Sequence, residues 1–242
     1  MTPDVTSFQL PFPWTRLMAR IFFSLALFAT SLLLANLVLG LSGGDANTTA
    51  REYLQARETL QNLARREETG EAVGQELAEA KEMFATARDR YQPIRRWQTF
   101  HFMLGLLAAL VTVLVNSISL TYFIGTSRWC TEVVNTYSLD PQLIERSRKI
   151  KRKNFPWSFS GILLVLAVIA MGGASDPGAN TTNPASWVAP HRFLAIGATL
   201  WIGWSFLKQV VLVGSHYELI EEIIELVEEK RKGEGSEPAG SA

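Results

Sequence analysis

Long apolar stretches without charge recur four times along the chain and set its fold class. Ile21–Leu41 contains 21 uncharged residues, and Gln98–Ser127 contains 30. Phe155–Ser175 contains a further 21, and Phe193–Leu207 contains 15 before Lys208 interrupts an otherwise uncharged run. A helix needs about 20 mainly apolar residues to cross the roughly 30 Å hydrocarbon core of a bilayer. The pattern therefore predicts an all-α integral membrane protein with four transmembrane helices.

The first apolar stretch is expected to remain in the protein as an anchor. It is longer than the apolar core of a signal peptide, which has about 7–15 residues. No clean small-x-small cleavage site precedes Gly43. We therefore count this stretch as the first transmembrane helix.

Polar sequence with heptad spacing separates the first two apolar stretches. The apolar residues of each half recur three or four positions apart: Tyr53, Ala56, Leu60 and Leu63, then Leu77, Ala80, Phe84, Ala87 and Tyr91. Each set gives one apolar stripe along a helix. Gly70 interrupts the pattern, and Pro93 is expected to end it. The segment is therefore predicted to be an antiparallel, coiled-coil-like helical hairpin outside the membrane, between spans 1 and 2.

Two further helical regions are predicted outside the apolar stretches. After span 2, a short helix over Thr131–Tyr137 and a turn precede a second helix, which Asp140 and Pro141 are suited to begin. After span 4, apolar residues at helical spacing and an acidic face predict an amphipathic helix over 215–232. The last residues have the polar composition of a disordered tail.

These patterns divide the chain into consecutive segments. The expected order is a cytoplasmic N-terminal segment over 1–16, transmembrane helix 1 over 17–41, the external helical hairpin over 42–97, transmembrane helix 2 over 98–125, a cytoplasmic basic helical loop over 126–155, transmembrane helix 3 over 156–175, an external loop over 176–191, transmembrane helix 4 over 192–214, the cytoplasmic amphipathic helix over 215–232 and the disordered tail over 233–242.

The orientation follows from the distribution of lysine and arginine. The segment 126–156 carries seven basic residues, whereas 176–192 carries one. Because short cytoplasmic loops are enriched in basic residues, both termini are expected in the cytoplasm and the protein in the plasma (inner) membrane. The hairpin, with nine basic residues, departs from this rule, although segments of about 60 residues or more are less subject to it.

A dense basic cluster stands directly before the third span. Its members are Arg146, Arg148, Lys149, Lys151, Arg152 and Lys153. Against the cytoplasmic face of a bilayer such a cluster attracts anionic lipids. Nucleic acid is not the expected partner, because the cluster lacks base-reading or stacking groups and 23 basic residues balance 23 acidic ones overall. Trp97, Trp157 and Trp187 are expected at the membrane interfaces.

Two histidines carry the only candidate cofactor chemistry. His101 follows Trp97 by four residues before span 2, and His191 follows Trp187 by four residues before span 4. Two imidazoles at similar depth in a helical bundle can bind haem, copper or a quinone head group. The alternative is that all four rings are ordinary interfacial residues. If each Trp–His pair were helical, its two rings would share one face of the helix. Pro190 argues against this for the second pair, because it is expected to hold Trp187 outside the helix.

Polar residues inside the predicted spans are few. Asn36 and Asn116 are expected to hydrogen-bond across helices. No aspartate or glutamate lies within a span, so the sequence offers no carboxylate relay. The single Cys130 can form neither an intramolecular disulfide nor a cysteine-based zinc site.

No arrangement typical of a catalytic site is found, so the pattern favours a non-catalytic protein. The leading interpretation is an accessory, scaffold or assembly subunit of a membrane complex. It would contact other membrane-protein subunits, or copies of itself, through the hairpin and the C-terminal helix. Two alternatives remain open: a membrane sensor or signal transducer, and a haem-, metal- or quinone-binding protein that uses His101 and His191.

Overall fold

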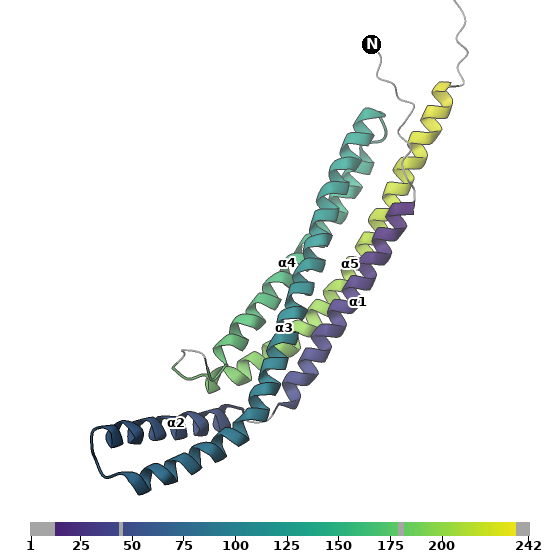
Figure 1. Cartoon of the computed structure of the whole chain (residues 1–242). Helices are drawn as coiled ribbons and strands as arrows, with labels where there is room; N and C mark the ends of the chain where they lie inside the picture. Colours follow the sequence, from purple (N-terminus) through teal and green to yellow (C-terminus); the bar gives the residue numbers. More distant parts are fainter. Residues whose placement is uncertain (1–12, 44–45, 179–181, 236–242) are drawn as a thin grey trace, which may run out of the picture. The chain divides into compact units, whose positions relative to one another are not determined.

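All regular structure in the described part of the chain is helical. The computed structural model describes residues 13–43, 46–178 and 182–235, with side chains from residue 20 to residue 233 of these ranges. The helices are α1 (Pro13–Ser42), α2 (Ala46–Glu68), α3 (Gly74–Thr136), α4 (Gln142–Ala174) and α5 (Ala185–Gly235), as Figure 1 shows. This confirms the all-α fold class.

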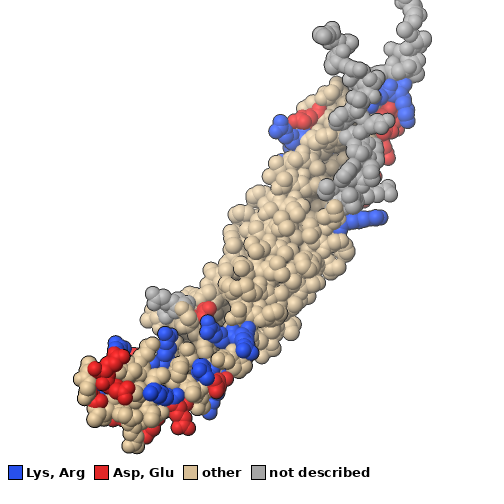
Figure 2. Space-filling view, in the orientation of Figure 1, with Lys and Arg blue, Asp and Glu red and all other residues tan. Residues whose placement is uncertain are grey.

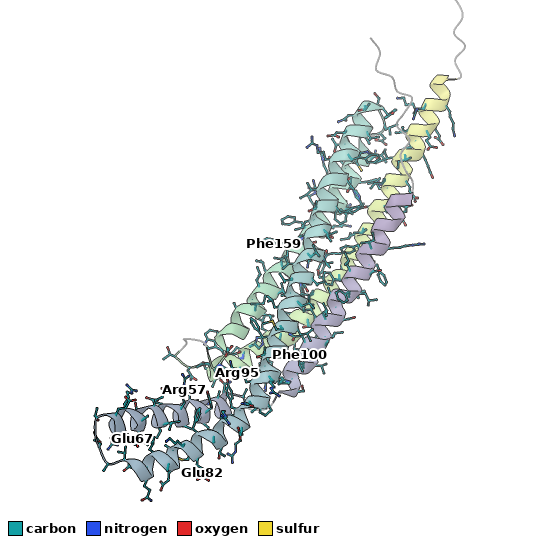
Figure 3. The ribbon with its side chains drawn as sticks, in the orientation of Figure 1. Arg57, Glu67, Glu82, Arg95, Phe100 and Phe159 are labelled. Atoms are coloured by element: carbon teal, nitrogen blue, oxygen red, sulfur yellow. The ribbon has the colours of Figure 1, made fainter. Side chains whose placement is uncertain are left out.

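Four of these helices are long and apolar enough to cross a membrane. The candidate spans are Arg20–Ser42, Gly74–Thr136, Gln142–Ala174 and Ala185–Gly233. Figure 2 shows a broad surface over the apolar parts of the long helices that lacks lysine, arginine, aspartate and glutamate. Large apolar side chains of these helices are exposed, among them Phe100, labelled in Figure 3, and Phe193 at 78%. Because water would not favour such a surface, these helices indicate a membrane protein.

Two prolines that were expected to limit helices lie inside them. Pro93 is within α3, and Pro190 is within α5. A proline removes one backbone donor, but the residues on both sides of Pro93 retain strong reasons to be helical. Before it runs a packed apolar stripe, and after it an apolar stretch whose backbone groups would be unpaired in lipid outside a helix. Pro190 lies near the start of α5, where a missing donor is tolerated more easily.

The connection between α3 and α4 is shorter than expected. The separate helix predicted over Thr131–Tyr137 is wrong, because α3 runs without a break to Thr136. The expected start of the next helix is confirmed: the backbone N–H of Gln142 donates to Oδ1 of Asp140 at 2.8 Å. Ser138 makes the turn with a φ of 48°.

The expected terminal segments fall largely outside the described residues. Residues 1–12 belong to the predicted N-terminal segment, and 236–242 to the predicted disordered tail. Residues 233–235, which were also assigned to the tail, belong to α5 instead.

The chain divides into two compact units. Unit 1 comprises Met1–Thr30, Val111–Leu163 and Trp201–Ala242, and unit 2 comprises Ser31–Leu110 and Leu164–Leu200. The apolar core of unit 1 joins the end of α5 to α3 and α4. Its buried residues are Cys130, Val134, Leu143, Ile144, Leu219, Ile220, Ile223 and Ile224. The apolar face of the C-terminal helix is therefore covered by the chain's own helices.

In unit 2, α2 lies beside the first part of α3 (Figure 1). The ring of Tyr53 contacts those of Phe84 and Tyr91, with centroids 5.6 and 4.9 Å apart. Leu77 and Ala80 are buried nearby. Charged side chains of both signs cover this helix pair in Figure 2; Figure 3 labels three exposed examples, Arg57, Glu67 and Glu82.

Candidate ligand-binding cavity

A cavity of about 710 Å³ lies within unit 2. We call it the histidine cavity, because both predicted histidines line it. Residues of all five helices form its wall, and much of the wall is apolar: Leu33, Leu37, Phe102, Leu106, Val165 and Ile169. Its volume is within the range of small-molecule sites, roughly 300–1,000 Å³, and the combination of an apolar wall with a few polar groups is typical of them.

His101, on α3, packs directly against α1. A Cβ added to Gly40 would lie 2.8 Å from Cε1 of the His101 ring, so the glycine makes room for the imidazole. Its Nδ1 atom is buried and has no hydrogen-bond partner.

His191, on α5, repeats this arrangement against α4. A Cβ added to Gly172 would lie 3.1 Å from Cε1 of the His191 ring. Nδ1 of His191 is also buried without a partner. Two helix pairs thus present an imidazole to the cavity in the same way.

The two tryptophans differ in their positions. Trp97 lines the cavity and stacks on His101, with ring centroids 5.6 Å apart and planes 7° from parallel. Its indole packs against Gly43, where a Cβ would lie 2.0 Å from Cη2. Trp187 is 43% exposed and does not line the cavity. The spacing of four residues therefore places only the first tryptophan at the cavity.

Asn36 supplies the third unpartnered polar group. It lines the histidine cavity from α1, and its side-chain amide packs on Gly105 of α3, where a Cβ would meet Nδ2 at 2.9 Å. Its Oδ1 is buried without a partner. Among the described residues, the side chain of Asn36 makes no hydrogen bond to another helix, although the sequence predicts one. The same prediction is confirmed for Asn116, whose Oδ1 accepts a hydrogen bond from Gln209 of α5.

Charged groups line the cavity only through exposed residues. These are Arg51 on α2, Arg192 on α5, and Asp176 just after α4. Within the described residues, no group of three or more His, Cys, Asp and Glu side chains comes together as a metal site. Of these residue types, His101, His191 and Asp176 line the cavity, but they do not come together as a group that could hold a metal ion.

A second polar cluster lies in unit 1, where side-chain hydrogen bonds join the helices, although Oδ1 of Asn154 is buried without a partner. Gln209 on α5 donates to Oδ1 of Asn116 at 3.0 Å and to Ser205 at 3.0 Å, and it accepts from Ser158 at 2.9 Å. Asn154 donates to Ser158 at 3.0 Å. All of these residues are buried. Hydrogen bonds of this kind hold transmembrane helices together, at about 1 kcal/mol each.

His216 is a buried histidine that sequence reasoning did not assign to any site. Its Nε2 lies 3.0 Å from Oγ of Ser147, which also bonds to Ser127 at 3.1 Å. The rings of Tyr122 and Phe123 contact it edge-on. The spacing of seven residues from Gln209 to His216, and from Ser147 to Asn154, is the sequence signal that places these polar groups on one face of each helix.

The basic cluster lies on α4, where most of its side chains are exposed. Arg146 donates to Glu222 of α5 at 2.8 Å, and this hydrogen bond raises the pKa of Arg146. Arg148 pairs with Glu145 one turn before it. Lys149, Lys151, Arg152 and Lys153 complete the cluster. Trp157, at the end of the cluster, packs against Trp201 with centroids 5.5 Å apart.

Comparisons of the chain with models of protein families, with curated proteins and with solved structures find no match. The function is therefore argued from the chain's own residues.

Proposed function

We propose that this protein is a multi-pass membrane protein that binds a small amphipathic molecule in the histidine cavity. One observation carries this proposal. Among the described residues, five buried side-chain atoms have no hydrogen-bond partner, and three of them, Nδ1 of His101, Nδ1 of His191 and Oδ1 of Asn36, belong to residues that line the same cavity.

The energetic cost of this arrangement favours a ligand. A buried polar atom without a hydrogen bond destabilises a protein by about 1–3 kcal/mol. Most native structures avoid this cost by pairing such atoms, as unit 1 does around Gln209. A molecule with a polar head and an apolar tail would pair with the polar atoms and fill the apolar wall.

The test is to identify what the protein retains when it is purified from a bacterial membrane in mild detergent. Native mass spectrometry and organic extraction are expected to show one amphipathic molecule per chain. The substitution Ala195→Trp puts an indole into the cavity wall and is expected to abolish retention, because Ala195 lines the cavity.

The matched control is Ala170→Trp. Ala170 is exposed on α4 in the same unit and does not line the cavity. This variant should retain the molecule like the unaltered protein. If the unaltered protein carries no bound molecule, or if both variants retain it equally, the proposal is wrong.

The orientation expected from the basic residues completes this proposal. With both termini in the cytoplasm, the basic cluster would face the anionic lipids of the inner leaflet. His101 and His191, which stand at the starts of the second and fourth apolar stretches, would then lie toward the external side of the plasma (inner) membrane.

A second candidate function is an accessory or assembly subunit that contacts other membrane proteins or copies of itself. The observation that favours it is the pair formed by α2 and the start of α3, where Leu54 is 45% and Met83 is 56% exposed. Blue-native electrophoresis in mild detergent tests this role. A larger assembly that is lost in a Leu54→Glu, Met83→Glu variant is expected; a monomer in both samples would contradict it.

A further inference from the structure

We propose that the histidine cavity binds a single-chain anionic amphipath, a molecule with a carboxylate or phosphate head on one hydrocarbon tail. This inference rests on the proposed function, because it names the chemical class of the molecule that occupies the cavity. Its basis is the pair of arginines in the lining and the length and exposure of the apolar wall.

The charged part of the lining is basic on balance. Arg51 of α2 and Arg192 of α5 line the cavity, against a single acidic lining residue, Asp176. Oδ1 of Asp176 accepts a hydrogen bond from the backbone N–H of Gly178 at 2.8 Å, so this carboxylate is engaged in its own turn. Among the described residues, neither arginine belongs to an ion pair. Because a guanidinium binds carboxylate and phosphate oxygens well, the two side chains suit an anionic head group.

The apolar wall suits one extended hydrocarbon tail. Along it α1 and α3 run antiparallel, because Gly43 meets the ring of Trp97 and Gly40 meets that of His101. The lining of α3 extends from Trp97 to Ala109, a separation of 12 positions. At 1.5 Å per residue, this separation corresponds to about 18 Å along the helix. Most lining residues beyond Gly40 and His101 on these helices are apolar: Leu33, Leu37, Phe102, Leu106, Ala108 and Ala109.

The exposure of the lining indicates how a ligand would enter. Phe102 is 56% and Leu106 is 41% exposed, although both line the cavity from an apolar helix. A tail can therefore reach the wall directly from the hydrocarbon of a bilayer. Arg192 directly follows His191 in α5 and is exposed, so an anionic head beside it also lies at the level of that imidazole. Arginine side chains extend toward the boundary between membrane and water, where a charged head group remains hydrated.

A phospholipid with two acyl chains shares the anionic head but fits the cavity less well. The volume of about 710 Å³ is that of a site for a small molecule. A second acyl chain would remain outside the wall and gain nothing from it. Equal binding of a two-chain lipid is therefore an outcome that contradicts the inference.

The experiment uses the full chain in nanodiscs of zwitterionic phosphatidylcholine. A dodecanoate with a diazirine near the end of its tail is cross-linked to the protein by light, and mass spectrometry locates the modified residues. Cross-links are expected on wall residues such as Leu37 and Leu106. Dodecanoate and dodecyl phosphate should displace this probe at membrane concentrations about tenfold lower than dodecanol, since only the anions pair with the arginines.

The arginine variants test the role of charge. Arg51→Gln and Arg192→Gln should each weaken dodecanoate binding by about threefold, as expected for an exposed ion pair, and both together by about tenfold. Displacement by dodecanol should not change. The matched control is Arg57→Gln, because Arg57, labelled in Figure 3, is exposed on α2 but does not line the cavity. It should bind dodecanoate like the unaltered protein.

Three results would overturn the inference: equal displacement by dodecanol and the two anions, equal displacement by phosphatidylglycerol and dodecanoate, or equal losses in all three single arginine variants. Failure of the proposed function is distinguishable from these results. In that case no probe would cross-link to the cavity wall, and Ala195→Trp would change nothing. Cross-links in the cavity that Ala195→Trp abolishes, without preference for anions, would refute this inference alone.

Discussion

Gly40 of α1 and His101 of α3 are in such close contact that a Cβ on the glycine would lie 2.8 Å from the imidazole. Real Cβ atoms hardly ever approach another atom this closely, so any larger residue at position 40 must move the ring. The same relationship, at 3.1 Å, joins Gly172 to His191. The two glycines therefore determine where the two unpartnered nitrogens point.

The first prediction concerns these glycines. Gly40→Ala should displace the His101 ring and weaken ligand binding by about tenfold or more, since one hydrogen bond in a buried site is lost. Its effect on stability should be small, because alanine favours the helix by roughly 0.5–1 kcal/mol and partly offsets the clash. Ligand titration combined with thermal unfolding measures both quantities.

Gly197→Ala is the matched control for that substitution. Gly197 lies in α5 of the same unit, and a Cβ there meets nothing within 4 Å. This variant should bind ligand normally and unfold at a slightly higher temperature. Equal loss of binding in both variants would show that the contact with His101 is not the cause.

The second prediction compares the two asparagines. Asn36→Leu removes an unpartnered buried oxygen, so the ligand-free protein should be as stable as the unaltered protein or more stable. Asn116→Leu removes the acceptor for Gln209 and should destabilise the protein by about 1–3 kcal/mol. Denaturant-induced unfolding in detergent, without ligand, measures the difference. The same sign for both changes would contradict the assignment of Asn36 to a binding role.

The third prediction concerns the hydrogen-bond cluster of unit 1. Gln209→Met keeps the length of the side chain but removes the hydrogen bonds that join Gln209 of α5 to Asn116 of α3 and to Ser158 of α4. The expected cost is about 1–3 kcal/mol, whereas Arg146→Met, which breaks an exposed ion pair with Glu222, should cost roughly 1 kcal/mol or less. Unfolding titrations of the two variants decide this. If the exposed pair matters more than the buried cluster, the account of unit 1 is wrong.

The fourth prediction concerns orientation. In a Cys130→Ser background, a membrane-impermeant maleimide should label Glu82→Cys in intact bacterial cells, and Lys149→Cys only after the membrane is opened. Both positions are exposed on the protein, so access depends on the side of the membrane. The reverse pattern would contradict the orientation derived from the basic residues.

The apolar stretches alone predict the helical class and the four long apolar helices, because a long uncharged run has few alternatives to a buried or membrane helix. The helix limits were predicted less well. Pro93 and Pro190 argue locally against a helix, but each removes only one backbone donor, and the adjoining apolar sequence outweighs that loss.

The candidate site was predictable in part. The matching Trp-x-x-x-His spacings drew attention to His101 and His191, and the structure places both at one cavity. The role of Gly40 and the unpaired state of Asn36 were not predictable, because both depend on which faces of different helices meet. The role of Gln209 was not predictable either, because its position beside Lys208 does not show that its amide meets Asn116 of another helix.

Nitrogen NMR of the histidine side chains tests the central claim most directly. The chain has three histidines, and His216 lies in unit 1, away from the cavity lining, as an internal reference. In protein labelled with ¹⁵N-histidine, adding the amphipathic molecule that the protein retains on purification should shift the ring-nitrogen signals of His101 and His191 and leave those of His216 in place. Unchanged signals for His101 and His191, or equal shifts for all three histidines, would contradict the binding of a ligand in the histidine cavity.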